Sequence, residues 1–187
     1  MAGDFVDPQE QVTLTGRSGR QVLVRRIAPG DSDLLVELYY RLSAETQELR
    51  FFASNRPEPV IQQHVQGVVQ ADPKLHLVLV AFVSEGERQK AIGVARYARD
   101  AAEPAIAEFA IVVQDDYQAD GLGRQLLRLL VEAARLRGVT HLRAVWRSQN
   151  QAIQKMIASS GLPFTSTTSQ GETTTLLELG PAGEMFS

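Results

Sequence analysis

Hydrophobic and polar positions follow two rhythms along this chain, and each rhythm predicts one kind of element. Short apolar or alternating runs predict strands at residues 12–15, 21–27, 75–83, 91–99, 103–113, 141–146, 165–169 and 173–179. Apolar residues at helical spacing predict helices at residues 34–42, 46–52, 60–70, 122–137 and 150–158. Because a crossover helix joins them, the strands at 103–113 and 141–146 are expected to be parallel.

Capping and breaking residues set the expected ends of these helices. Asp31 or Ser32 is expected to cap the first helix, and Pro57 and Pro59 to end the helical piece that begins at Thr46. Gly138 follows the long helix, where a C-terminal glycine belongs.

Length and composition predict one domain over residues 11–180, with a loose polar lead at 1–10 and a tail at 181–187. The formal charge of -3 argues against general binding to nucleic acid or to anionic membranes. The chain has no cysteine, which excludes disulfides, thiolate nucleophiles and cysteine metal sites. Neither a signal pattern nor a bilayer-length apolar run is present, so a cytoplasmic protein is expected.

The most informative stretch is a buried strand, a polar loop, Gly121-x-Gly123 and a helix. The first turn of a helix has unpaired backbone N–H groups and a dipole that favours an anion. Glycines there allow a phosphate to approach the backbone closely. The pattern therefore predicts a phosphate or pyrophosphate cradle, although Gly-x-Gly at such a junction is often plain turn chemistry.

Two familiar phosphate motifs do not fit. A P-loop requires Gly-Lys-Ser/Thr, whereas Gly123 is followed by Arg124 and Gln125. A dinucleotide fingerprint requires a small residue where Leu126 stands and an acidic residue after the next strand, which ends in Arg147.

The remaining pattern, Gln118-x-x-Gly121-x-Gly123, resembles the signature Gln/Arg-x-x-Gly-x-Gly/Ala of the GNAT family of N-acetyltransferases. The order of elements also resembles that family over roughly residues 12–180. Residues 41–52, Arg-Leu-Ser-Ala-Glu-Thr and then Leu-Arg-Phe-Phe, resemble a segment of bacterial Pat-type protein lysine acetyltransferases. The stretch Asn150-x-x-Ile153-x-x-Met156-Ile157-x-x-x-Gly161 resembles the family's Asn-x-x-Met/Ala…Gly-Phe helix.

This resemblance implies an α/β, three-layer fold with a mixed central sheet flanked by helices. It implies direct transfer of an acetyl group from acetyl-CoA, without a metal, to an amine, expected to be a protein lysine. It also implies that the backbone of Ile111, Val112 and Val113 pairs with the pantetheine arm, and that an N–H near Val112 polarises the thioester. The residues implied to hold the pyrophosphate are Gln118, Ala119, Asp120, Gly121, Leu122, Gly123 and Arg124.

Glu108 is the candidate general base, because it stands in an apolar strand in register with Ala110 and Val112. The resemblance implies that a glutamate about here accepts the amine proton, often through water, and partial burial would raise its pKa. A solvated carboxylate on the open face of the sheet is the alternative. Asn150 is expected to contact the pantetheine chain, to cap its helix, or to do both.

The sequence departs from the family pattern at two places. Ile157 stands where many relatives have a tyrosine that protonates the leaving thiolate. Asp120 occupies a position that is often basic, and Asp115 and Asp116 are nearby, so cofactor binding is expected to be weak unless these carboxylates point away.

The remaining candidate residues have ordinary explanations. His64, His76 and His141 show no metal-ligand spacing, and Trp146 is expected in the core or at its rim. Residues 49–52 are expected to line the amine entrance, unless Phe51 and Phe52 are simply core.

Three functions stay open from the sequence. They are a protein lysine acetyltransferase, an acetyltransferase for a small amine such as a polyamine or antibiotic, and a module that senses acyl-CoA without turnover. An acidic, deep acceptor cleft would favour the small cation, and a shallow groove the protein lysine. The oligomeric state does not follow from the sequence.

Overall fold

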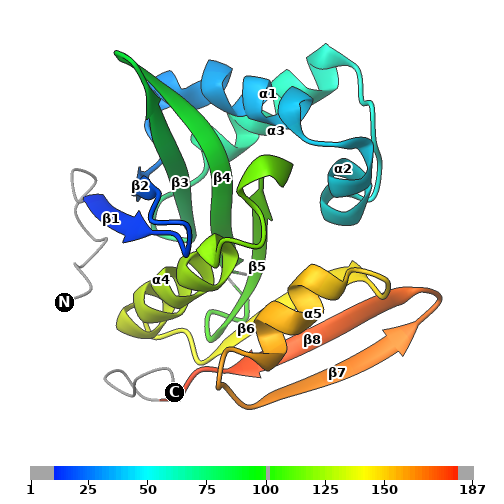
Figure 1. Ribbon diagram of the computed structural model, residues 1–187. Helices are drawn as coiled ribbons and strands as arrows, with labels where there is room; N and C mark the ends of the chain where they lie inside the picture. The colour runs from blue at the N-terminus through cyan, green and yellow to red at the C-terminus, as the bar shows by residue number, and fades with distance from the viewer. Residues whose placement is uncertain (1–10, 100–101, 181–187) are drawn as a thin grey trace.

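The computed structural model describes residues 11–99 and 102–180, and the predicted lead at 1–10 and tail at 181–187 lie outside this part. The described chain forms an eight-stranded sheet with the order β1-β2-β3-β4-β5-β6-β8-β7 (Figure 1). The strands are β1 Gln11–Thr15, β2 Gln21–Arg26, β3 His76–Glu85, β4 Arg88–Arg99, β5 Ile106–Val113, β6 His141–Arg147, β7 Phe164–Ser169 and β8 Glu172–Glu178.

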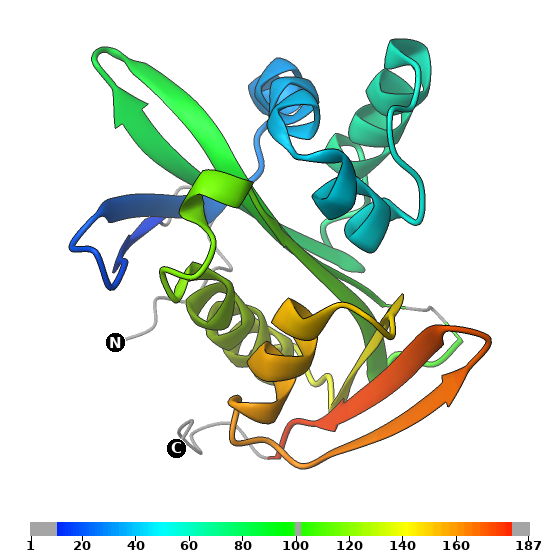
Figure 2. The same ribbon diagram turned by 45° about the vertical axis from the view of Figure 1, so that its right-hand side comes forward.

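Helices cover both faces of the sheet. The helices are α1 Ser32–Arg41, α2 Ala44–Phe51, α3 Glu58–Val69, α4 Leu122–Leu136 and α5 Gln151–Ala158, with short 3-10 turns η1 Pro29–Asp31 and η2 Asp115–Tyr117. Helices α4 and α5 lie on one face, and α1 and α3 lie on the other (Figures 1 and 2). Helix α2 contacts both β5 and β6.

The parallel pair predicted from the crossover helix is confirmed, but its two strands share only a short register. Strand β5 pairs with β4 from Ala107 to Val113. It pairs with β6 only at Ile106, Ala107 and Glu108. Beyond Glu108 the two strands diverge, and β6 continues as the antiparallel partner of β8.

Alternation along the strands divides the buried side chains between two cores. Val112 packs with Phe82 and Leu38 under α1 and α3. Its neighbour Val113 packs with Leu126 and Leu130 of α4. Successive residues of a strand point to opposite faces, so β5 supplies both cores and is fixed from both sides.

Three predicted details were wrong. Pro59 lies in the first turn of α3 instead of ending the preceding helix, because the first turn needs no N–H donor from it. Strands β3 and β4 extend farther than predicted, to a tight turn at Gly86, which has φ +64°. Strand β5 begins at Ile106 rather than at residue 103.

Asp31 precedes α1 but does not cap it through its side chain. Its carboxylate instead accepts two hydrogen bonds from Arg25, at 2.7 and 2.8 Å, and one from the Ala28 N–H at 2.7 Å. Burial works to raise the pKa of Asp31, but these hydrogen bonds outweigh it and lower the pKa. The residue therefore fixes the start of α1 to β2.

The core between α4 and the sheet, which we call the α4 core, gives the first prediction. Leu130 is 0% exposed, so Leu130→Ala should lower the free energy of unfolding by about 2–5 kcal/mol through lost burial and a residual cavity. Leu136, in the last turn of the same helix, is 54% exposed, so Leu136→Ala should change it by less than about 0.5 kcal/mol. Urea unfolding measures both. Similar losses in the two variants would contradict the packing described.

Candidate functional site

The divergence of β5 from β6 leaves one edge of β5 without a strand partner in the described chain. The N–H of Gln114 donates to Ile92 O, toward β4, whereas the carbonyl of Val113 points the other way and accepts from Gln118. Backbone direction alternates along a strand, so Ile111 faces the same side as Val113, and Val112 faces β4. We call the side of β5 from Ile111 to Val113 that faces away from β4 the open edge.

Backbone groups along the open edge can bind an extended ligand as a strand would. Strand pairing satisfies the backbone donors and acceptors, and backbone groups without a strand partner remain available to hydrogen-bond a ligand. An N–H near Val112 was expected to polarise the thioester. The N–H and carbonyl of Val112 itself face β4, so they are not available at the open edge. Ile111 and Val113 carry the available N–H groups.

The open edge leads into the cradle predicted from the glycine motif. Here the α4 cradle means residues Gln118–Gly121 and the first turn of α4. Ala119 and Gly121 have positive φ values of 59° and 83°, which turn the chain sharply before α4 begins at Leu122. The first turn of α4 lies toward the C-terminal end of β5, where the open edge is (Figure 2). Its N–H groups have no partner within the helix.

The two motif glycines have different reasons for being glycine. Gly121 has the left-handed backbone that favours glycine. Gly123 is helical, and a Cβ there would lie 3.5 Å from the Met156 sulfur, which is an ordinary contact. Neither backbone strain nor packing requires glycine at 123, so the fold leaves room for a small side chain there.

The Asp120 carboxylate points away from the cradle and into the β1–β2 turn. It accepts from the Ser18 N–H at 2.7 Å and from the Ser18 hydroxyl at 2.8 Å. These bonds lower the pKa of Asp120. A Cβ on Gly16 would overlap this carboxylate, which accounts for a glycine at that position.

Arg17 is a residue of the site that the sequence did not indicate. Its N–H donates to the Asp120 carbonyl at 3.0 Å. Its Nε lies 3.5 Å from where a Cβ on Gly121 would stand, so its side chain lies against the cradle. The sequence signal was a Gly-Arg-Ser-Gly turn, which predicted only a hairpin.

Asp115 also points away from the cradle, toward α2. It accepts from the Ser43 N–H at 2.9 Å, the Ser43 hydroxyl at 2.6 Å and the Thr46 hydroxyl at 2.7 Å. Partial burial works to raise the pKa of Asp115, but these hydrogen bonds outweigh it and lower the pKa. Asp116 accepts from the Gln114 side chain at 3.2 Å. These carboxylates were expected to weaken anion binding, but each of them is hydrogen-bonded to groups outside the α4 cradle.

Gln118, the first residue of the motif, holds the loop in place. Its Nε2 donates to the Val113 carbonyl at 2.9 Å and to the Thr46 hydroxyl at 3.3 Å. It therefore connects the end of β5 to α2 and fixes the path of the cradle. Arg124 lies exposed on the first turn of α4.

Glu108 stands at the last paired position between β5 and β6, where the two strands separate. Its side chain is 56% exposed and lies 3.8 Å from Arg143 on β6. The partial burial expected for it is not found. Arg96 lies opposite Ala110, on the same face of the sheet as Glu108. The charge of Glu108 acts on both Arg96 and Arg50.

Asn150 caps α5, since its side-chain oxygen accepts from the Ile153 N–H at 3.2 Å. Ile157 is buried in the α4 core, on the same helix. Trp146 is also buried, and its indole N–H donates to the Thr175 hydroxyl at 3.1 Å, which confirms a core role.

Phe51, which ends α2, and Phe52, which follows it, are both partly buried. Phe51 makes edge contacts with Tyr39 at 5.3 Å and with His64 at 6.0 Å between ring centroids. Phe52 lies under the Arg147 guanidinium, 4.8 Å from its ring centre. The segment thus packs α2 against α1 and α3 while staying partly at the surface.

Other kinds of site are not seen in residues 11–99 and 102–180. Within these ranges no three His, Asp or Glu side chains gather as metal ligands. No helix of the described chain is both long and apolar enough to cross a membrane.

Known proteins match this arrangement. A family model described as "Acetyltransferase (GNAT) family" matches residues 37–161. An acetyltransferase of Pseudomonas aeruginosa is 28% identical over 144 residues, which cover 76% of this chain and 75% of that protein. Acetyltransferase Pat of Mycolicibacterium smegmatis is 30% identical over 157 residues, 84% of this chain. The chain spans only 45% of the length of that Pat protein. The GNAT domain of S. lividans PAT is similar in structure, with a TM-score of 0.80 at 25% identity, over 90% of this chain and 97% of that one.

The hydrogen bonds of Asp115 give a pH prediction. Because its folded-state pKa is lowered, its contribution is complete above the ordinary aspartate pKa of about 4 and is lost as pH falls through the lowered value. Wild-type protein should therefore lose more stability between about pH 5 and pH 2 than Asp115→Asn does. Urea unfolding across this range, with Asp116→Asn from the same turn as control, measures the difference. Parallel profiles for wild type and Asp115→Asn would contradict it.

Proposed function

Because the chain belongs to the GNAT acetyltransferase family, we propose that it transfers the acetyl group of acetyl-CoA to the side-chain amine of a lysine in a protein. The observation that carries the proposal is the open edge of β5 leading into the α4 cradle. The similarity to proteins named Pat supports a protein acceptor. Acetyl-CoA supplies the acetyl group as an activated thioester.

The open edge suits the amide-bearing arm of coenzyme A. Backbone N–H and C=O groups of Ile111 and the N–H of Val113 would pair with these amides, while Val112 stays in the sheet. Asn150 uses its oxygen as the α5 cap, so its amide nitrogen is the group that would donate to the same arm. Backbone pairing leaves the side chains of β5 in the two cores, so binding and folding do not compete.

The α4 cradle suits the pyrophosphate. Backbone N–H groups from Gly121 to Arg124 would face it, with the helix dipole adding a favourable field. Arg17 lies beside Gly121 and would add a positive charge. Since Asp115 and Asp120 are engaged elsewhere, the reason for expecting weak cofactor binding is removed.

Glu108 is the group proposed to receive the amine proton, directly or through a water molecule. Its exposure suits contact with an acceptor from outside, and its place at the separation of β5 and β6 is where the open edge begins. The N–H of Ile111 is the gap-facing donor nearest to it in sequence, and would polarise the thioester carbonyl. Ile157 cannot protonate the leaving thiolate, so that proton would come from solvent.

The surroundings of Glu108 bear on the other acceptors considered. A polyamine or a cationic antibiotic would need an acidic pocket, whereas Glu108 faces Arg50, Arg96 and Arg143. This positive lining disfavours a small polycation.

Gly123 tests the cradle. Gly123→Val should weaken acetyl-CoA binding by about tenfold or more, because the side chain would hold the pyrophosphate away from the backbone. Valine and glycine are both poor helix formers, so the thermal midpoint should change little. Gly123→Ala, which the family signature permits, is the matched control and should bind almost normally. Unchanged affinity by calorimetry in folded Gly123→Val would remove the cradle from the site.

Glu108 tests the chemistry. Glu108→Gln should bind acetyl-CoA normally and lose about 10²–10⁴-fold in turnover, the usual contribution of a general base. The loss should shrink as pH approaches the lysine pKa of about 10.4, because more of the acceptor is already neutral. Glu87→Gln, in the β3–β4 turn, is the control for loss of one exposed carboxylate. A wild-type rate and pH profile in Glu108→Gln would exclude Glu108 as the base.

A further inference from the structure

Positive charge gathers around the one carboxylate at the proposed reaction centre. Arg50 comes from α2, Arg96 from β4 and Arg143 from β6. Arg143 lies 3.8 Å from Glu108 of β5, and the charge of Glu108 acts on Arg50 and Arg96. We call these three residues the arginine cluster. They lie far apart in the sequence, so the fold assembles the cluster.

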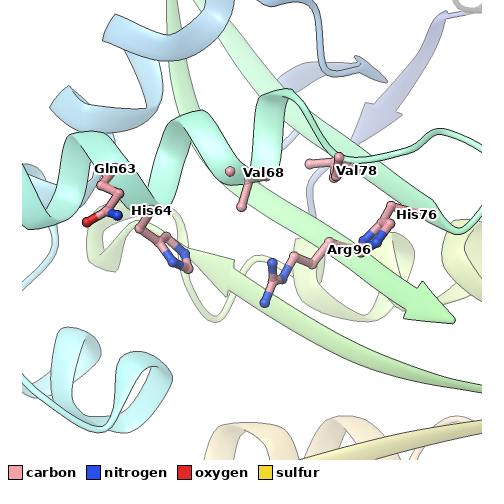
Figure 3. Close-up of a pocket in the computed structure, with 8 residues that line it drawn as sticks. Gln63, His64, Val68, His76, Val78 and Arg96 are labelled. Atoms are coloured by element: carbon pink, nitrogen blue, oxygen red, sulfur yellow. The ribbon is translucent and has the colours of Figure 1, made fainter. Parts of the chain in front are cut away.

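Arg96 stands on the face of β4 that α3 covers, opposite Val78 of β3 and Ala110 of β5. Its guanidinium extends toward His64 of α3 along a cavity of about 230 Å³ (Figure 3). Burial lowers the pKa of Arg96, while Glu108 opposes the shift. The positive potential is also felt by His64, whose pKa is lowered by partial burial and by Arg96, Arg50 and Arg56.

Arg50 has a donor that nothing in the described chain satisfies. Its Nε is enclosed and has no hydrogen-bond partner there. Its guanidinium lies 4.9 Å from the ring centre of Phe51. Burial and Arg96 together lower the pKa of Arg50 to about 10, so it still carries its charge at neutral pH. A buried cationic donor without an acceptor is a costly arrangement that a bound anion relieves.

The cluster poses a problem for a lysine acceptor. Three arginines face one glutamate, so an incoming ammonium meets net positive charge. The neighbouring group of Arg147 with Glu48 at 3.2 Å and Glu172 at 3.4 Å adds one net negative charge, which reduces this positive balance without reversing it. An acceptor enters such a place more easily when it brings a negative charge with it.

We propose that the acceptor lysine is adjacent to an aspartate or glutamate whose carboxylate binds Arg50 and Arg96, so that the enzyme selects lysines in acidic sequences. This inference rests on the proposed function, since it describes the acceptor of that reaction. Guanidinium groups are well suited to carboxylates because they donate in a planar fork.

The cluster also has a consequence for the chemistry. Nearby positive charges lower the pKa of an ammonium, which makes the neutral, nucleophilic amine easier to reach. The carboxylate would therefore bind at Arg50 and Arg96, while the amine reaches Glu108. Binding of the acidic neighbour and activation of the lysine use the same field.

A peptide series tests the inference. Peptides with blocked ends and one lysine, flanked on both sides by aspartate, asparagine or arginine, are compared by kcat/KM for acetyl transfer. The aspartate peptide should exceed the asparagine peptide by about tenfold or more, the effect of one charge-assisted hydrogen bond, and the arginine peptide should be poorest.

Variants of the cluster identify the cause of the preference. Arg96→Gln should reduce the aspartate-to-asparagine ratio to within about threefold, with acetyl-CoA affinity unchanged. Arg50→Lys keeps the charge and should retain most of the ratio, whereas Arg50→Gln should lose it. Thermal melts identify any variant that fails to fold, and the other position then decides. Arg88→Gln, exposed at the β3–β4 turn, is the control and should keep the wild-type ratio.

The outcomes separate the inference from the proposed function. Acetylation of all three peptides at similar rates overturns the acidic preference and leaves the lysine acetyltransferase intact. A preference that persists unchanged in Arg96→Gln and Arg50→Gln overturns the role of the cluster. Acetylation of free glutamate or aspartate but of no peptide shows that the carboxylate comes from a small amino acid, and overturns both proposals.

Discussion

The parallel strands β5 and β6 pair at Ile106, Ala107 and Glu108 and then separate, while β5 stays paired with β4 to its end. A strand edge inside a sheet ordinarily has its donors and acceptors satisfied by a neighbour. Here the backbone of Ile111 and the N–H of Val113 face a side where the described chain has no strand to pair with them. Two cores hold β5 rigidly, so the edge is fixed in place before any ligand arrives.

The rest of the site depends on keeping the loop after β5 in register with that edge. Gln118 binds the last carbonyl of β5, Asp115 binds Ser43 and Thr46 at the start of α2, and Asp120 binds the β1–β2 turn. These contacts turn the acidic side chains outward from the α4 cradle. The same side chains that made anion binding look unfavourable in the sequence are the ones that shape the cradle.

Helix α2 connects the α4 cradle to the surroundings of Glu108. Its first turn binds Asp115 beside the cradle, and its last turn carries Arg50 toward Arg96 and Glu108. The first part of this segment, Leu-Ser-x-Glu-Thr, thus contacts the loop after β5. The second part, Leu-Arg-Phe-Phe, brings Arg50 toward Glu108.

Local signals in the sequence were enough to predict the order of elements, the parallel pair and the turn at Gly121. The GNAT fold inferred from them is confirmed by the similarity to the S. lividans PAT domain. The contact of Asp120 with Ser18 could not be predicted, because it joins residues 102 apart and leaves no pattern in either segment. The arginine cluster was missed for the same reason, since Arg50, Arg96 and Arg143 stand on three separate elements and are related to one another only through Glu108. The predicted partial burial of Glu108 was wrong, because alternation predicts which face of the sheet a side chain takes. It does not predict whether other elements cover that face.

The open edge of β5 is tested most directly by residue-resolved amide hydrogen exchange with and without acetyl-CoA. Binding should slow exchange at Ile111 and Val113, whose N–H groups face the gap, and in the first turn of α4. Exchange at Val112 should be slow in both states and change little, because its N–H is already directed to β4. Acetyl-CoA that binds while Ile111 and Val113 exchange as before would show that the ligand lies elsewhere and would contradict the site described.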